Sequence, residues 1–124
     1  MKPTERGFAH MRLATQYSYR GIRSAWRNEE SFRQEVLVVM VGLPLAVWLA
    51  RDTVDFLLLA LPLLLLMCAE LANSAIEATV DRVSEEYHEL SGRAKDMGSA
   101  AVFMAITIVI LSWTTVCLSI FYSN

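Results

Sequence analysis

The amino-acid sequence predicts an all-α integral membrane protein with three transmembrane helices. Three long stretches, Val36–Ala50, Phe56–Ala69 and Met97–Asn124, contain no charged residue. Charged residues make up 19% of the 124 residues, whereas an average soluble domain has about 25%. A run of about 18 apolar residues is typical of a membrane-spanning helix; the third stretch reaches this length alone and the others with their flanks. A soluble globular protein is excluded, and the length suits one domain, residues 1–124.

An N-terminal amphipathic surface helix is predicted over residues 8–27, because apolar and polar side chains each recur there at helical spacing. The apolar stripe holds Phe8, Met11, Thr15, Tyr19, Ile22 and Trp26, and the neighbouring polar stripe holds Arg12, Gln16, Arg20, Arg23 and Arg27. A basic amphipathic helix of this kind can lie in the headgroup layer, with its arginines toward anionic lipid. A cytoplasmic helix packed on its own protein is the alternative.

The three spans are predicted at residues 32–49, 54–76 and 96–121. Arg51–Thr53 is a minimal turn, so the first two spans must be antiparallel. A polar loop over residues 84–93 separates the second span from the third.

The distribution of basic residues predicts the orientation in the membrane. Seven of the eleven lysines and arginines precede the first span, and three more lie between the second and third spans. Only Arg51 lies in the first loop, and none follows the third span. The positive-inside rule therefore places the N-terminus and the second loop in the cytoplasm and the C-terminus outside. Topology accounts for these charges and no aromatic–basic reading motif accompanies them, so no nucleic-acid partner is expected.

Polar residues in the second span form the most informative pattern. Five of them, Glu70, Asn73, Ser74, Glu77 and Asp81, fall within an arc of about 100° on a helix. An ionisable group inside a membrane span is costly and is by default a candidate functional residue. The alternative is a polar seam that joins helices, but carboxylates on one seam repel each other. A functional site is therefore favoured.

Depth in the membrane sharpens this interpretation. At a rise of about 1.5 Å per residue, Glu70 lies roughly 21 Å from Phe56, and Glu77 roughly 31 Å. Because the hydrocarbon core is about 30 Å thick, Glu70 lies within the cytoplasmic leaflet and Glu77 at its surface. This arrangement suits a reaction between a lipid and a soluble reagent.

Further candidate residues follow in the second loop and the start of the third span: His88, Arg93, Lys95, Asp96 and Ser99. The two cations could hold phosphate oxygens, and Glu29 and Glu77 could hold Mg²⁺, which prefers one or two carboxylates plus substrate phosphates. Taken singly, a surface histidine and a snorkelling lysine are the alternatives. No Walker A motif or Gly-rich kinase loop is present. The residues alone indicate a lipid-facing membrane enzyme, with phosphoryl transfer as a candidate reaction.

Two long segments, Glu70–Arg82 (ELANSAIEATVDR) and Glu86–Val102 (EYHELSGRAKDMGSAAV), resemble the signature of the prokaryotic diacylglycerol kinases, Gram-negative type. Shorter matches are Asn28-Glu29, Phe32–Glu35, Tyr17-Ser18, Gly21 and Trp26, so that the resemblance extends from Gly7 to Trp113. It implies a homotrimeric helical bundle in the bacterial inner membrane, with the C-terminus in the periplasm. Such an enzyme transfers the γ-phosphate of ATP to sn-1,2-diacylglycerol with Mg²⁺, giving phosphatidic acid.

The resemblance also implies roles for individual residues. Glu70 is expected to be the general base on the lipid hydroxyl, with Asn73 beside it, and Glu29 and Glu77 are expected to hold Mg²⁺. The implied ATP contacts are Tyr17, Glu29, Glu77, Glu86, Tyr87, His88, Lys95 and Asp96. The implied lipid-site residues are His10, Arg23, Ser24, Ala25, Trp26, Ser31, Phe32, Arg33, Gln34, Glu35, Trp48, Glu70, Ser99 and Trp113. His10 departs from the family, which often has Arg at this phosphate-contacting position, and Arg12 is a nearby substitute.

Two alternative functions remain open at this point. An undecaprenol kinase would keep the same fold and chemistry with another lipid. A small cation-coupled transporter using Glu70 would be non-enzymatic, but would need no cluster such as His88–Asp96. If the enzyme interpretation is right, a chain this short is expected to form its site with neighbouring subunits of the trimer.

Overall fold

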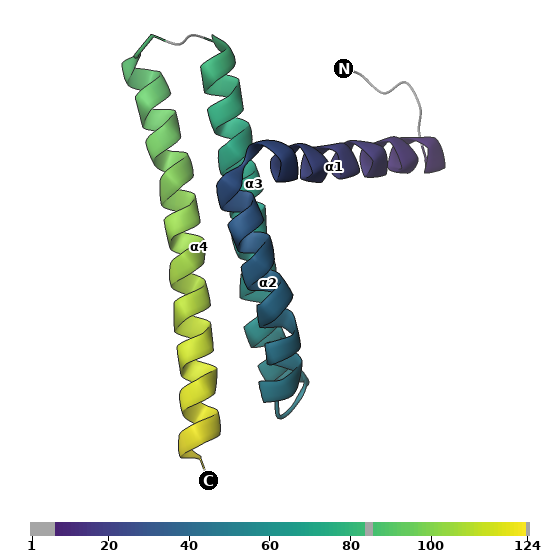
Figure 1. Ribbon diagram of the computed structural model, residues 1–124, viewed down its shortest axis with the longest axis vertical. Helices are drawn as coiled ribbons and strands as arrows, with labels where there is room; N and C mark the ends of the chain where they lie inside the picture. The colour runs from purple at the N-terminus through teal and green to yellow at the C-terminus, as the bar shows by residue number, and fades with distance from the viewer. Residues whose placement is uncertain (1–6, 84–85, 124) are drawn as a thin grey trace.

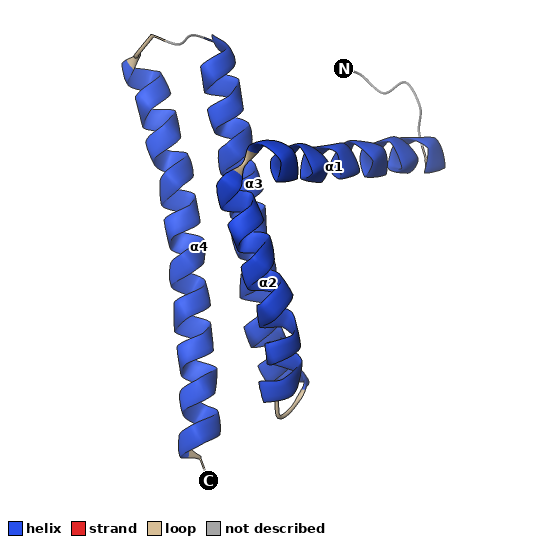
Figure 2. Ribbon diagram, in the orientation of Figure 1, coloured by secondary structure: helices blue, strands red, loops and turns tan. Residues whose placement is uncertain are grey.

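The computed structural model describes residues 7–83 and 86–123 and contains four helices in these ranges. They are α1 (Phe8–Asn28), α2 (Glu30–Leu49), α3 (Thr53–Val83) and α4 (Glu89–Tyr122). The last three run alongside one another, while α1 projects sideways from the end of α2 (Figure 1). No strand occurs in the described ranges, and the connections are short (Figure 2).

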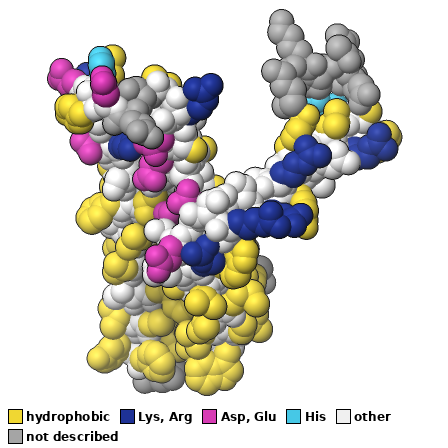
Figure 3. All heavy atoms as spheres, turned by 45° about the horizontal axis from the view of Figure 1, so that its top comes forward, with side chains coloured by type: hydrophobic (Ala, Val, Ile, Leu, Met, Phe, Trp, Pro, Cys, Tyr) yellow, Lys and Arg dark blue, Asp and Glu magenta, His cyan; other side chains and the backbone are white. Residues whose placement is uncertain are grey.

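Three of these helices, α2, α3 and α4, are long and apolar enough to cross a membrane. The predicted all-α class with three spans and an N-terminal amphipathic helix is therefore confirmed. Hydrophobic side chains cover the lower part of the bundle, whereas the charged ones gather toward its upper end and along α1 (Figure 3).

The predicted polar loop over residues 84–93 is wrong at its C-terminal side, because α4 already begins at Glu89. The backbone N–H of Leu90 donates to Nδ1 of His88 over 3.1 Å, so that His88 caps the helix. An acidic residue in the first turn, here Glu89, is favourable beside the positive end of the helix dipole. Residues that read as polar loop therefore form the first turn of α4.

A single extended residue, Glu29, joins α1 to α2. The guanidinium of Arg33 reaches back and donates to the carbonyl oxygens of Trp26 (2.7 Å) and Arg27 (3.3 Å). Carbonyl groups in the last turn of a helix have no partner within that helix. Arg33 therefore satisfies two of them and stabilises the elbow between the two helices.

At the opposite end of the bundle, Arg51 connects the α2–α3 turn to the last turns of α4. Its guanidinium forms an ion pair with Asp55 (2.8 Å) and donates to Oγ of Ser119 (3.0 Å) and of Ser123 (3.2 Å). The side chain of Asp55 is buried, and its backbone N–H donates to Asp52. The turn and the end of α4 are thus held by one connected set of polar contacts.

Within the apolar part of the bundle, α3 and α4 are joined at Pro62. Proline has no N–H, so the carbonyl of Leu58, one turn earlier, lacks its usual helical donor. The hydroxyl of Ser112 on α4 donates to this carbonyl, and Nε1 of Trp113 donates to the carbonyl of Leu59 over 2.9 Å. Unsatisfied backbone groups are costly in a bilayer, so α4 completes the bonding that Pro62 removes.

Replacing Ser112 with Ala should lower the free energy of unfolding by about 1 kcal/mol, a typical size for an interhelical hydrogen bond in a membrane protein. The measurement is a denaturant titration in mixed micelles. In a Pro62→Ala background, the new N–H can donate to the carbonyl of Leu58, so the same change should cost markedly less. An equal cost in both backgrounds would contradict the role given to Pro62.

Candidate active site

Four carboxyl groups meet where the α1–α2 elbow lies against α3. Glu70 is 6% exposed, inside the apolar part of α3. Glu35 from α2 lies close enough for its carboxyl group to act on that of Glu70. Glu29 and Glu77 lie close enough for their charges to act on Glu70. The helical spacing of α3 and the one-residue elbow together bring these acidic side chains to one place.

The pair formed by Glu35 and Glu70 can be hydrogen-bonded only when one carboxyl group carries a proton, because an ionised carboxylate only accepts. Oε2 of Glu35 is buried, and no donor within the described residues bonds it. A proton held between the two groups relieves the repulsion that two buried carboxylates would otherwise feel. The pair can therefore store or accept a proton at lipid depth.

Asn73 links the acidic group to α4. Its Nδ2 donates to Oε1 of Glu77 over 3.2 Å. Its Oδ1 is buried against Gly98 of α4 and has no hydrogen-bond partner among the described residues. A Cβ atom at position 98 would collide with this oxygen. Close approach at Gly98 therefore fixes Asn73, which in turn orients Glu77.

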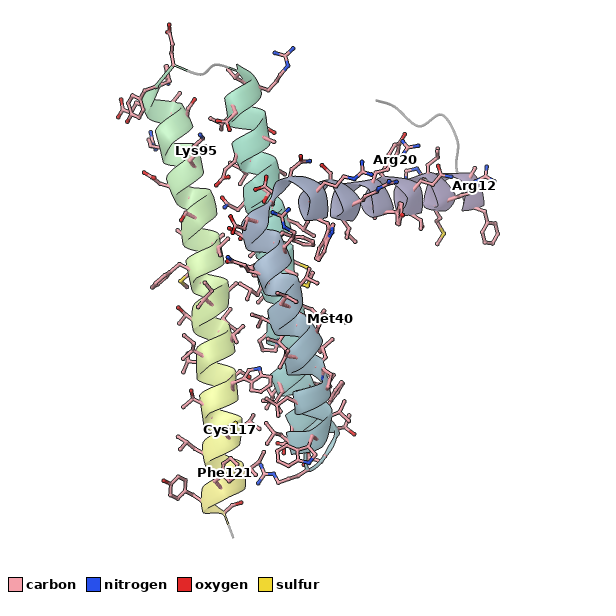
Figure 4. The ribbon with its side chains drawn as sticks, in the orientation of Figure 1. Arg12, Arg20, Met40, Lys95, Cys117 and Phe121 are labelled. Atoms are coloured by element: carbon pink, nitrogen blue, oxygen red, sulfur yellow. The ribbon has the colours of Figure 1, made fainter. Side chains whose placement is uncertain are left out.

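Lys95 supplies a positive charge beside the acidic residues. Its Nζ lies 2.7 Å from Oδ1 of Asp81 and also interacts electrostatically with Glu77. In Figure 4 the Lys95 side chain lies on the side of α4 that faces α3. The sequence predicts that Asp81 lies on the polar stripe, but it does not single out Asp81 as a site residue. The pairing joins residues 14 positions apart, which requires knowing how α3 and α4 face each other.

Lys95 and Asp81 form part of a cavity of about 290 Å³ between the ends of α3 and α4. Its lining is Val80, Asp81, Glu86, Tyr87, His88, Ser91, Gly92, Lys95 and Asp96. Five of the residues expected to contact ATP are therefore gathered around one hollow. His88 also caps α4, so one of its ring nitrogens has a structural partner.

A larger cavity of about 600 Å³ lies between α1 and α3. Its lining is Ser18, Gly21, Ile22, Ser24, Ala25, Asn28, Glu29, Leu71, Ser74, Ala75 and Ala78. It brings Glu29 together with Ser24 and Ala25, which were expected at the lipid site. Small side chains on both helices leave this space open.

Other predicted site residues lie away from the acidic group within a single chain. Along α1, Tyr17 and His10 are about 18 Å and 28 Å from Glu29, at about 1.5 Å per residue. Trp48 is exposed near the far end of α2, and Trp113 packs beside Ala46. One chain does not bring these four residues to the carboxyl groups.

The residues expected at the lipid site on α2 and α4 differ in their burial and in their contacts. Phe32 is almost fully buried, and Arg33 bonds the end of α1. Ser31, Gln34 and Ser99 are exposed. On α1, Arg23 and Trp26 are exposed as well. Phe32 and Arg33 thus have a clear structural role.

The carboxylates around Glu70 suit one of two kinds of Mg²⁺ site. Among the described residues, no group of three or more His, Cys, Asp or Glu side chains is arranged to hold a metal ion. Mg²⁺ commonly binds through one or two carboxylates and completes its octahedron with water and substrate phosphates. Glu29 and Glu77, both near Glu70, fit this second kind of site.

Comparison with known proteins decides the family. The family model described as prokaryotic diacylglycerol kinase matches residues 16–117. The chain belongs to the prokaryotic diacylglycerol kinase family. The resemblance found in the sequence, and with it the expectation of a lipid kinase, is confirmed.

Curated diacylglycerol kinases are similar over most of the chain. That of Escherichia coli is 50% identical over 107 residues, covering 86% of this chain and 88% of the relative. That of Pseudomonas aeruginosa is 47% identical over 112 residues, covering 90% and 91%. That of Haemophilus influenzae is 45% identical over 107 residues, covering 86% and 91%. Membership of this kinase family argues against the non-enzymatic transporter.

Replacing Gly98 with Ala should destabilise the protein by about 1–3 kcal/mol, the usual cost of overpacking a tight contact. The new methyl group displaces Asn73 and disturbs its bond to Glu77. Thermal unfolding in detergent measures the effect. In an Asn73→Ala background the obstructing amide is gone, so Gly98→Ala should then cost little. If the stability losses of the two single variants simply add in the double variant, the strain does not arise from the contact between Gly98 and Asn73.

Proposed function

We propose that this protein transfers the γ-phosphate of ATP to the free hydroxyl of sn-1,2-diacylglycerol, giving phosphatidic acid. The observation that carries the proposal is the position of Glu70. It is buried in a membrane-spanning helix, two turns from Glu77, on the polar stripe of α3 that continues to Asp81 in the Lys95 cavity. A carboxyl group at lipid depth, on a stripe that leads to a polar cavity, suits a reaction in which a lipid hydroxyl meets a soluble phosphate donor. Membership of the kinase family supports the same reaction.

Glu70 acts in its ionised form as the general base, while Glu35 keeps the proton of the pair. The carboxylate of Glu70 accepts the proton of the lipid hydroxyl as that oxygen attacks the γ-phosphorus. A new oxygen–phosphorus bond forms, and the bond between the γ-phosphorus and the oxygen of the leaving ADP breaks. Phosphoryl transfer needs mainly positioning and charge stabilisation, and Asn73 supplies positioning by holding Glu77.

Glu29 and Glu77 are the residues that would hold Mg²⁺, whose charge neutralises the phosphate oxygens during transfer. Lys95 leaves Asp81 and binds a phosphate oxygen of ATP. The remaining ATP contacts are proposed to be Tyr17, Glu86, Tyr87, His88 and Asp96. We propose that the lipid site is lined by the residues that the family resemblance implies, from His10 on α1 to Trp113 on α4.

We further propose a homotrimer in the bacterial inner membrane, with α1 and the α3–α4 loop in the cytoplasm. The separation of His10, Tyr17, Trp48 and Trp113 from the acidic group of their own chain supports this assembly. A neighbouring subunit can supply residues that the single chain keeps apart. The concentration of basic residues before α2 and around the α3–α4 loop supports the orientation.

Glu70→Gln should lower the rate of phosphate transfer by about 10²–10⁴-fold, the usual contribution of a general base, with ATP affinity nearly unchanged. The assay follows labelled phosphate from ATP to diacylglycerol and to undecaprenol, side by side in mixed micelles. Glu89→Gln is the matched control, because it makes the same change at an exposed residue outside the cavity lining.

The two acceptors distinguish the two kinases that share this chemistry. Label on diacylglycerol that disappears in Glu70→Gln supports the proposal. Label on undecaprenol alone would replace the lipid substrate, and equal losses of turnover and ATP affinity would argue against Glu70 as the base.

Glu77→Gln should raise the Mg²⁺ concentration needed for half-maximal activity by about tenfold, because one of two carboxylate ligands is lost. The measurement is a Mg²⁺ titration at saturating ATP. An unchanged titration, matching that of Glu89→Gln, would remove Glu77 from the metal site.

A further inference from the structure

Ser74 is a residue of the α3 polar stripe that the proposed reaction leaves without a role. It lies one turn from Glu70 and one turn from Glu77, it is half-buried, and it lines the cavity between α1 and α3. Glu29, whose charge acts on Glu70, lines the same cavity. The hydroxyl group of Ser74 therefore lies among the residues for which phosphoryl transfer is proposed.

This hydroxyl group has no partner of its own. Hydroxyl groups in helices commonly donate to the carbonyl oxygen four residues earlier. Thr79 donates in this way to Ala75 over 2.8 Å, and Ser18, on the α1 wall of the cavity, donates to Ala14 over 2.9 Å. Ser74 makes no such bond, and none to another side chain within the part of the chain that the structure describes. Its proton is therefore free to bond a group that enters the cavity.

The position of Ser74 along α3 indicates which group that is. At a rise of about 1.5 Å per residue, Ser74 lies about 6 Å outward from Glu70, and Glu77 lies about 10 Å outward. In the proposed reaction the attacking lipid oxygen is at Glu70, and the phosphates of ATP approach from the level of Glu77. The phosphorus atom that is transferred must pass between these two levels, which is where Ser74 lies.

Asn73 and Ser74 lie on opposite sides of the line from Glu70 to Glu77. At 100° per residue, Asn73 falls about 60° to one side of Glu70 and Ser74 about 40° to the other. The structure agrees, because Asn73 contacts Gly98 of α4 whereas Ser74 lines the cavity against α1. The amide of Asn73 already donates to Glu77. Ser74 is therefore a neutral donor at this level that remains free for substrate.

We propose that Ser74 is a further catalytic residue, whose hydroxyl group donates a hydrogen bond to an oxygen of the phosphoryl group during its transfer. This inference rests on the proposed kinase function. While the bond from the lipid oxygen to phosphorus forms and the bond to the leaving ADP oxygen breaks, Ser74 keeps its proton and Glu70 takes that of the lipid hydroxyl. Negative charge is spread over the three equatorial oxygens during transfer, and a donor already in position stabilises it.

The test compares the kinetics of Ser74→Ala with those of the wild-type enzyme in mixed micelles, with ATP and diacylglycerol varied in turn. Ser74→Ala should lower kcat by about 100-fold, a typical effect of losing one such donor. The KM of each substrate should change by less than about threefold, because the bond forms only in the transition state. Thermal unfolding should be unchanged, because the hydroxyl group bonds nothing within the described residues.

Thr79→Val is the matched control. It removes a hydroxyl group from the same helix, at an exposed position outside the cavity lining, and should leave kcat unchanged. If Ser74→Ala does not fold, Ser74→Cys tests the same hydroxyl group, because a thiol is only a weak donor.

Three outcomes would overturn the proposal. An equal kcat for Ser74→Ala and Thr79→Val would show that the hydroxyl group of Ser74 takes no part in transfer. A raised KM for one substrate with kcat unchanged would make Ser74 a binding residue for that substrate. A lower unfolding temperature alongside the lower kcat would make its role structural. Wild-type protein that transfers no phosphate would contradict the proposed function itself, whereas an unaffected variant of an active enzyme contradicts only the role of Ser74.

Discussion

The burial of the Glu70 carboxyl group in a membrane-spanning helix is the constraint on which the rest of the structure depends. An ionisable group at that depth is expensive unless its surroundings compensate it. Glu35 provides a partner that can share a proton, and the α1–α2 elbow brings Glu35 and Glu29 within reach. The polar stripe of α3 then continues outward to Glu77 and Asp81, where Lys95 supplies a counter-charge. The polar groups of the site therefore extend along one face of α3, from Glu70 at lipid depth to Asp81 toward the water.

The polar contacts outside the site hold the helices of the bundle together. At the end opposite the Glu70 site, Arg51 pairs with Asp55 and holds the last turns of α4. Between the ends, Ser112 and Trp113 donate to backbone carbonyls of α3. These contacts give α4 fixed points along its length, so that Gly98 and Lys95 keep their positions against α3. The packing away from the site therefore contributes to the geometry within it.

Much of the fold could be predicted because hydrophobic periodicity and uncharged stretches depend only on local sequence. The stripe on α3 was predictable for the same reason, since helical spacing alone places Glu70, Asn73 and Glu77 on one face. The contacts between helices were not. Arg51 bonds Ser119 across 68 positions, and Pro62 gains its significance only from the hydroxyl of Ser112. The early start of α4 was missed because Glu89–Arg93 is polar, although a cap at His88 and an acidic first turn are helix signals.

The elbow at Glu29 has a mechanical consequence. One extended residue separates two helices that run in different directions, and Arg33 ties the end of the first to the start of the second. No flexible loop is present there to absorb movement. Any change in the angle between α1 and α2 must therefore be accommodated at Glu29 itself, whose charge acts on Glu70. The angle of the elbow and the position of one carboxyl group of the site are thus set by the same residue.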